Sequence, residues 1–416
     1  YTIDDAPNMW NVQYNVLRRA NRLIEAVENN KITDAEKNQA NVNNIYAQAK
    51  SVRALVHFDL VKVYGMPYSF DNGASMGVPI VTTPIDPLNA SAIPGRNTVA
   101  EVYTQIVKDL TEAIDSKALN VSKSAGDNQG FIDEWAAKAL LTRVYIYMGK
   151  NQEALDMAKN IIENSPYSLW TKAQYANAWD KNNANHINEM IFELVNSGSD
   201  DWADREGIAY LYHEDGYADA ICTKSFVDML AQDPSDVRLD VILPVQLKTD
   251  DNGKPTDMYK TYGDNRIFIN KFPMGSLGDM RLNNLPILRL SEVYLNAAEA
   301  AAKLNDKTST AKYLNEIIKN RTDDTKQLVT ESTATLERVL LERRKELVGE
   351  GQRFFDAMRN NETVTRYTNE DEKGWHYSIN KESQVFDRTY FRTILPIPVS
   401  ETNANPTLKA QQNPGY

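Results

Sequence analysis

The clearest pattern in the chain is a pair of apolar stripes at helical spacing, separated by a glycine. The first stripe recurs at intervals of three and four residues and contains Ala137, Leu141, Val144, Tyr145 and Met148. The second follows Gly149 and contains Ala154, Ala158, Ile161 and Ile162. Each stripe lies on one face of a helix, so the pattern predicts two short helices that bury against each other over residues 133–163. Gly149 is suited to end the first helix and Pro166 to stop the second.

The same segment fits the 34-residue tetratricopeptide pattern, a helix-turn-helix unit. The matching positions are Tyr145, Gly149, Ala154, Ala158 and Pro166. The pattern needs small residues at the two alanine positions because they let the helices approach closely. An unrelated antiparallel helix pair remains the alternative to this interpretation.

Looser copies of this unit occur elsewhere in the chain. They predict helix pairs over about 46–117, 287–320 and 334–359. A further amphipathic helix begins at Trp10. We therefore expect a mainly α fold, a tetratricopeptide-like solenoid of four helix pairs in which each pair buries its neighbour's face.

Three long irregular stretches separate the predicted helices. They cover about 65–97, 164–286 and 360–416, and they contain clusters of Pro, Gly, Asn and Asp. Loops of this length in a compact protein are usually functional or disordered. No composition shift marks a domain boundary. We expect one domain over 1–416, with the helices as scaffold and the loops as the ligand-binding region.

Composition and charge exclude several classes of function. The chain has 416 residues and a formal net charge of -11, and it has no concentrated Lys/Arg run, which argues against a nucleic-acid partner. No apolar stretch is long enough for a membrane-spanning helix. A single cysteine, Cys222, excludes an intrachain disulfide framework.

The sequence offers little support for catalysis. "GASMG", residues 73–77, matches the serine-hydrolase elbow, but that motif requires a strand before Ser75 and a helix after it. The sequence "VPIVTTPIDP" that follows cannot form this helix. No motif places any of the four histidines, His57, His186, His213 and His376. A glycosidase is a remote alternative, because no pair of carboxylates can be chosen among 57 acidic residues. We expect a protein that is not an enzyme.

Metal and cofactor sites are not indicated either. There is no H-E-x-x-H or paired-histidine spacing. "TDDNGKPTD", residues 249–257, does not have the register of an EF-hand, and a hairpin turn at Asn252-Gly253 explains it better. A calcium ion held by the loop carboxylates of Asp200, Asp201 and Asp204 remains an open alternative. The expectation is no metal and no cofactor.

Aromatic residues with polar tips are the more informative class. The chain has 21 tyrosines and 6 tryptophans, and several lie in the loops beside carboxylates and amides. Such rings can stack on a ligand while polar groups bond its edge, which suits the apolar face and hydroxyl rim of a sugar. The predicted ligand-binding residues are Tyr68, Asp201, Trp202, Arg205, Tyr210, Tyr212, Tyr217, Trp375 and Tyr377. The alternative for each ring is that it anchors its loop onto the helices.

The stretch "LLERRKELVGEGQRFFDAMR", residues 340–359, has nine charged residues around two glycines. Its apolar stripe predicts that the charged residues 342–346 lie largely on the other side of the helix. The signs alternate, so the run neutralises itself and cannot bind phosphate as a basic patch. We interpret it as structural bracing by arginine forks on carboxylates and helix ends.

The same stretch resembles the C-terminal signature of the SusD/RagB family, E-R-R-x-E-L followed by E-G-x-R and D-x-x-R. "RALVHFDLVKVYG", "NEMIFEL", "LPILRLSEVYLNAAEA" and "LPIPVSETNANPTLKAQQNPGY" are similar to other family segments, in the family's order. "NEMIFEL" corresponds to a central strand-like segment, so the resemblance adds minor β structure to the expected fold. The similarity extends over essentially the whole chain.

The resemblance implies a non-catalytic, lipid-anchored protein at the cell surface on the outer membrane. Such proteins capture oligosaccharides and pass them to a SusC-like TonB-dependent transporter. The anchoring N-terminal cysteine is absent from this chain, which fits a chain that begins after the anchor. The family's ligand-binding residues lie outside its recognisable motifs, so none is carried over. A peptide-capturing member of the family and, less favoured, a tetratricopeptide protein-protein adaptor are the alternatives.

Overall fold

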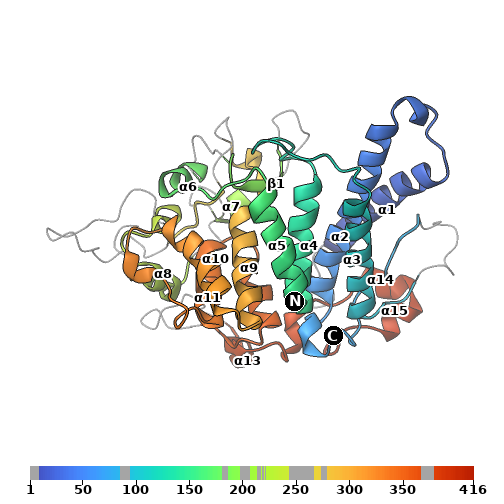
Figure 1. Cartoon of the computed structure of the whole chain (residues 1–416). Coiled ribbons are helices and arrows are strands. Elements are labelled where there is room, and N and C mark those ends of the chain that lie inside the picture. Colours follow the sequence, from blue (N-terminus) through green and yellow to red (C-terminus); the bar gives the residue numbers. More distant parts are fainter. Residues whose placement is uncertain are drawn as a thin grey trace.

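The computed structural model describes residues 9–84, 94–179, 186–196, 207–212, 217, 220, 222–242, 267–272, 279–366 and 379–416. Helices dominate these residues and stand side by side in a row (Figure 1). The row contains α2 (Gln39–Tyr64), α3 (Val99–Asp115), α4 (Glu134–Met148), α5 (Asn151–Asn164), α9 (Leu290–Lys303) and α10 (Lys307–Lys319). Each helix contacts the next in this order. The predicted mainly helical, tetratricopeptide-like fold is confirmed.

The α4–α5 pair has the features that its sequence predicts. Gly149 ends α4 in the left-handed conformation, with φ of 71°, which costs glycine less than any residue with a Cβ atom. Ala154 and Ala158 are completely buried on α5. The helix ends at Asn164, two residues before Pro166. Small side chains at the interface therefore allow the close packing that the pattern requires.

The fourth pair consists of α11 (Leu336–Glu346) and α12 (Arg353–Arg359). α11 packs on α9 and α10, and α12 contacts the 3-10 turn η2 (Tyr68–Phe70) that follows α2. The two helices are joined by an ion pair from Arg343 Nε to Asp356 Oδ2 of 2.7 Å. The C-terminal signature thus connects the end of the helix row to its beginning.

At the other end of the row, α1 (Met9–Glu28) forms an antiparallel hairpin with α2. The ring of Trp10 contacts Tyr64 near the start of the hairpin, and Tyr46 donates a hydrogen bond to Glu28 at its far end. A 3-10 turn, η1 (Ala35–Lys37), lies in the connection. Figure 1 shows this hairpin projecting beyond the neighbouring helices.

A two-stranded antiparallel sheet lies against α4. It pairs β1 (Met190–Leu194) with β2 (Leu285–Arg289), with Met190 opposite Arg289 and Leu194 opposite Leu285. The apolar run at 285–289 was expected to begin a helix, but it is a strand, and α9 begins directly after it. Pro286 suits a short edge strand better than a helix interior.

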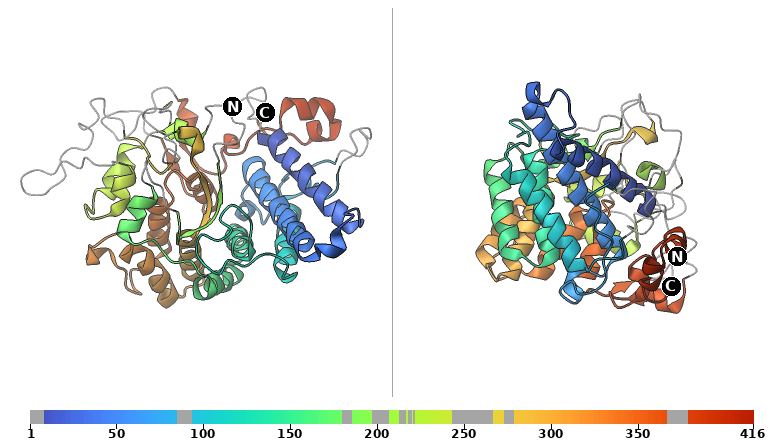
Figure 2. Two further views of the ribbon diagram at one scale, coloured as in Figure 1. Left: turned by 90° about the horizontal axis from the view of Figure 1, so that it is seen from above. Right: turned by 90° about the vertical axis from the view of Figure 1, so that its right-hand side faces the viewer.

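The long loop stretches contain several short elements. Within 164–286 these are α6 (Lys172–Ala178), α7 (Ile208–Tyr212), α8 (Lys224–Leu230), η4 (Val237–Val241) and η6 (Met280–Leu282). They lie on one side of the helix row, in green and yellow in Figure 2. Another 3-10 turn, η7 (Thr325–Gln327), connects α10 to α11. These stretches are therefore less irregular than their composition indicates.

The C-terminal segment returns to the end of α2. It contains α13 (Lys381–Gln384), η9 (Phe391–Thr393), α14 (Val399–Ala404) and α15 (Pro406–Ala410), and β4 (Val385–Phe386) pairs with β3 (Val364–Thr365). Asn413 donates to the carbonyl of Tyr64, and buried Arg96 donates to Asn413 and to the carbonyl of Gln411. Among the described helices, none is long and apolar enough to cross a membrane.

Candidate functional site

A buried network of ion pairs supports the loop-rich side of the fold. Arg289 at the end of β2 contacts Glu189, Glu346 and Glu350, and Arg321 contacts Glu189 and Glu346. All five side chains are almost fully shielded from water. Burial opposes ionisation of Glu346, but the guanidinium groups of Arg321 and Arg289 hold its pKa well below the usual value. The network fixes β1, β2 and α11 against one another.

This network corrects one expectation from the sequence. Glu342, Arg343, Lys345 and Glu346 were expected largely on an exposed side of their helix, but all four are buried. Glu342 pairs with Arg238 of η4 at 2.6 Å, and Arg343 pairs with Asp356. The structural role of the charged run is therefore confirmed, but its ion pairs are buried in the interior and do not lie on the surface. The apolar stripe of α11 gives the wrong expectation because the charged residues outside it are paired with oppositely charged residues distant in the sequence, which allows them to be buried.

An aromatic cluster covers part of the network. It consists of Trp170, Tyr175, Trp179 and His186, with ring centroids between 5.3 and 6.2 Å apart. Cations lie over its rings: Arg321 is 4.4 Å from the centroid of Tyr175, and Lys271 is 5.3 Å from that of Trp179. These loop aromatics are buried. For them the anchoring alternative is correct.

The predicted tyrosines at α7 are more accessible. The rings of Tyr210 and Tyr217 lie 5.8 Å apart, and the backbone N–H of Tyr217 donates to the carbonyl of Tyr210. Tyr217 is 48% exposed and Tyr210 is half-buried. The ring of Tyr212 is stacked on that of Phe272, with the centroids 5.7 Å apart and the ring planes 13° from parallel. Tyr212 also packs against a second hydrophobic core, the cluster of buried side chains that contains Trp179. The structure thus brings Tyr210 and Tyr217 together as a partly exposed aromatic pair, with Tyr212 as its anchor.

Tyr68 lies elsewhere. It is half-buried in η2, with its ring edge-on to Tyr103 of α3 at 5.3 Å. η2 contacts α4 and α12, whereas α7 contacts η6, so Tyr68 does not join the α7 tyrosines. The other predicted residues, Asp201, Trp202, Arg205, Trp375 and Tyr377, lie outside the described residues, as do Asp200 and Asp204 of the calcium alternative.

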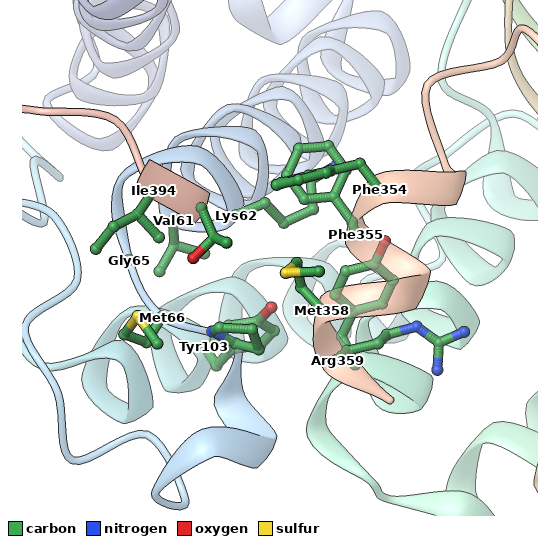
Figure 3. Close-up of a pocket in the computed structure, with 13 residues that line it drawn as sticks. Val61, Lys62, Gly65, Met66, Tyr103, Phe354, Phe355, Met358, Arg359 and Ile394 are labelled. Atoms are coloured by element: carbon green, nitrogen blue, oxygen red, sulfur yellow. The ribbon is translucent and has the colours of Figure 1, made fainter. Parts of the chain in front are cut away.

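The pocket in Figure 3 lies beside Tyr68 rather than beside α7. Residues from the end of α2, from α3, from α4, from α12 and from η9 line it. Val61 and Lys62 face Phe355 and Met358 across it. Its volume is about 370 Å³, including space open to solvent. No residue predicted from the sequence lines this pocket.

Phe131 is an exposed aromatic residue that was not predicted from the sequence. This side chain is 62% exposed on the loop between α3 and α4. The loop is held rigidly: Ser122 bonds Asp133, and Gln129 accepts a hydrogen bond from the backbone of Glu193 in β1. The signal that could have identified it is an aromatic residue directly after a polar, glycine-containing loop, "GDNQGF".

Metal binding finds no support in the part of the chain that the structure describes. There, no three His, Cys, Asp or Glu side chains gather in a group that could hold a metal ion. Cys222 is buried, and burial raises the pKa of its thiol to about 12.

The fold and the buried signature define a helical-repeat binding protein with loop insertions, and sequence comparison gives its family. The SusD family model matches residues 117–416, and a second model, described as starch-binding and associating with the outer membrane, matches residues 1–146. The chain belongs to the SusD family, as its resemblance predicts. Members are non-catalytic binding proteins, associated with carbohydrate binding and with the outer membrane, so the chain is not an enzyme.

Individual relatives agree with this assignment. A SusD superfamily protein from Bacteroides thetaiotaomicron is 37% identical, with a TM-score of 0.82 over 97% of this chain and 85% of that chain. A protein from Bacteroides vulgatus, provisionally named a sugar binding protein, is 36% identical, with a TM-score of 0.84 over 100% of this chain and 87% of that chain. SusD-like protein P25 from Formosa agariphila is 23% identical over 98% of this chain and 79% of its own length.

Proposed function

We propose that this protein captures oligosaccharides at the cell surface and passes them to a SusC-like TonB-dependent transporter in the outer membrane. It works as one domain over 1–416, held at the membrane by an N-terminal lipid anchor outside this chain. Family membership supports the carbohydrate ligand and the outer-membrane location. The name of the Bacteroides vulgatus relative agrees with a sugar ligand.

The observation that carries the proposal is the partly exposed pair of Tyr210 and Tyr217 on the loop-rich side of the fold. Two rings 5.8 Å apart offer adjacent flat surfaces to the apolar faces of sugars. Tyr212 fixes α7 by stacking on Phe272. Asp201, Trp202, Arg205, Trp375 and Tyr377 complete the proposed ligand set, together with Tyr68, which lies apart from the α7 tyrosines. Rigid support lowers the entropy lost when a ligand binds.

Calorimetry against a panel of oligosaccharides, beginning with maltoheptaose, tests the proposal. Replacing both Tyr210 and Tyr217 by alanine should weaken binding at least about tenfold, as for central aromatic contacts in other interfaces. Tyr46→Ala, which removes a half-buried tyrosine of α2 bonded to Glu28, is the matched control and should bind normally. If no sugar binds while peptides do, the peptide-capturing alternative replaces this one. Copurification with a barrel transporter from membranes tests the transfer step.

A further inference from the structure

The pocket between α2 and α12 has walls suited to one bulky apolar side chain. Its lining includes the rings of Tyr103, Phe354 and Phe355 and the thioether side chains of Met66 and Met358. Phe354, which lines the pocket, is 36% exposed. Figure 3 shows Phe354, Phe355 and Met358 on α12, facing Val61 and Lys62 of α2. An exposed aromatic beside an open apolar pocket marks a surface for binding.

Most polar groups at the pocket wall already have partners, although the buried hydroxyl of Tyr147 has none. Arg359 pairs with Glu299 and Asp356, Lys62 pairs with Asp59 at 2.9 Å, and Thr393 donates to a backbone carbonyl. A sugar placed here would lose hydrogen bonds to water for its hydroxyl groups and find few in return. The enclosed space is also small for an oligosaccharide. These features favour an apolar group.

Two arginines flank the pocket and lack a carboxylate within ion-pair distance among the described residues. Arg388 lies over the exposed ring of Phe70 and donates to Ser69, which in turn bonds the carbonyl of Arg359 in the pocket wall. Arg392, exposed over Phe391, directly precedes pocket residues Thr393 and Ile394.

The acidic groups nearby are largely occupied. Asp59 pairs with Lys62, and Glu362 pairs with Arg353 at 2.7 Å. Asp387, next to Arg388, accepts hydrogen bonds from Thr389, and these hold its pKa below the usual value, so it stays charged. Two arginines therefore stand beside one charged carboxylate, Asp387, so the balance of charge at the mouth is positive in a chain of net charge -11. Planar guanidinium groups over aromatic rings are well placed to receive a carboxylate.

We propose that this pocket docks an aromatic side chain of a partner polypeptide, with acidic residues beside it that pair with Arg388 and Arg392. The pocket supplies burial of the ring, and the arginines select the acidic flank. The surface is separate from the α7 tyrosines, so the proposal does not depend on which sugar the loops bind. It assigns the α2–α12 end of the helix row to protein contact.

Methionine methyl NMR gives a direct test, because Met66 and Met358 line the pocket and the other methionines of the 11 in the chain serve as internal references. The probe is the peptide acetyl-Asp-Phe-Asp-amide. It should shift the two pocket methyl signals in a saturable manner. Acetyl-Asp-Ala-Asp-amide and maltotriose should leave them unchanged. Acetyl-Lys-Phe-Lys-amide should bind about tenfold more weakly, the effect of roughly two exposed ion pairs.

Charge reversal tests the arginines. Arg388→Glu with Arg392→Glu should invert the preference between the acidic and the basic peptide. The matched control reverses two exposed arginines of α1, Arg18→Glu with Arg22→Glu, and should keep the wild-type preference. Raising the salt concentration should reduce the preference of the unmodified protein, which tests the same point without any substitution. Absence of pocket shifts with the Phe peptide, equal shifts with maltotriose, or a preference unaffected by both charge reversal and salt would overturn the proposal.

Discussion

His57 makes the stability of the N-terminal hairpin depend on pH. It is completely buried on α2, with Nδ1 3.0 Å from the carbonyl of Arg53, and its Nε2 accepts a hydrogen bond of 3.2 Å from the backbone N–H of Val81. The neutral ring satisfies both contacts, because Nδ1–H donates and Nε2 accepts. A second proton on Nε2 would face the Val81 donor. Low pH should therefore weaken the attachment of residues 78–82 to the hairpin, to which Asn21 and Arg53 also hold them by hydrogen bonds.

The magnitude follows from the shifted pKa. Burial, helped by the charge of Arg53 and opposed by Asp109, lowers the pKa of His57 from 6.5 to about 4. The unfolded chain then binds more protons than the folded one between these two values, so stability is fully present above about pH 6.5 and is lost as the pH falls toward 4. The linkage relation gives a loss of about 2 kcal/mol in the free energy of unfolding between pH 7 and pH 5.

Urea unfolding at pH 7, 6 and 5 measures this loss, and His57→Gln removes the titrating group. The free energy of unfolding of the variant should be lower than that of the wild type at pH 7 and should change less with pH, so the wild-type curve should approach it as the pH falls. Selective ¹⁵N labelling of the four histidines gives a second readout, in which His57 should remain neutral at pH 5. If the variant and the wild type lose equal stability over this range, the assigned tautomer and its contacts are wrong.

Three further predictions concern the scaffold. Arg289→Ala should lower the free energy of unfolding by about 3–5 kcal/mol, because it leaves three buried carboxylates without their shared cation. The control, Lys319→Ala, removes an exposed ion pair and should lower it by less than about 1 kcal/mol; urea unfolding compares the two variants. Gly149→Ala should lower the free energy of unfolding by about 1 kcal/mol, and with it the melting temperature, because φ of 71° strains a residue with a Cβ atom. An unchanged melting temperature in calorimetry would contradict the left-handed conformation at the end of α4. Cys222 should resist iodoacetamide in the native protein and react quickly in urea at the same pH, because the buried thiol stays protonated in the native protein. Mass spectrometry measures the labelling, and rapid labelling of the native protein would show that the surroundings of Cys222 open.

Local sequence patterns predict much of the frame. The α4–α5 pair is recognisable because its helices, glycine cap and small interface residues all lie within 34 residues, where spacing alone determines which side chains meet. The buried ion network could not be found in this way. Arg289 and Glu189 are 100 positions apart, and no local period indicates that they share one site.

The ligand site is harder for a related reason. An exposed and a buried loop aromatic look the same in a sequence: Tyr217 is exposed, whereas Trp179 lies in the second core. The difference depends on neighbours such as Lys271 and His186, which a composition argument does not place. The pocket between α2 and α12 was missed because its walls come from five separate segments of the chain.

The return of the C-terminal segment to α2 has a consequence for biosynthesis. The carbonyl of Tyr64 accepts hydrogen bonds from Arg96 and from Asn413, 349 positions later. Buried Arg96 also donates to Gln411 and Asn413. While a ribosome is still extending the chain, the first hairpin lacks these closing contacts. These contacts can form only after residue 413 has been translated, so an export pathway that needs an unfolded polypeptide would meet a chain in which they are still missing.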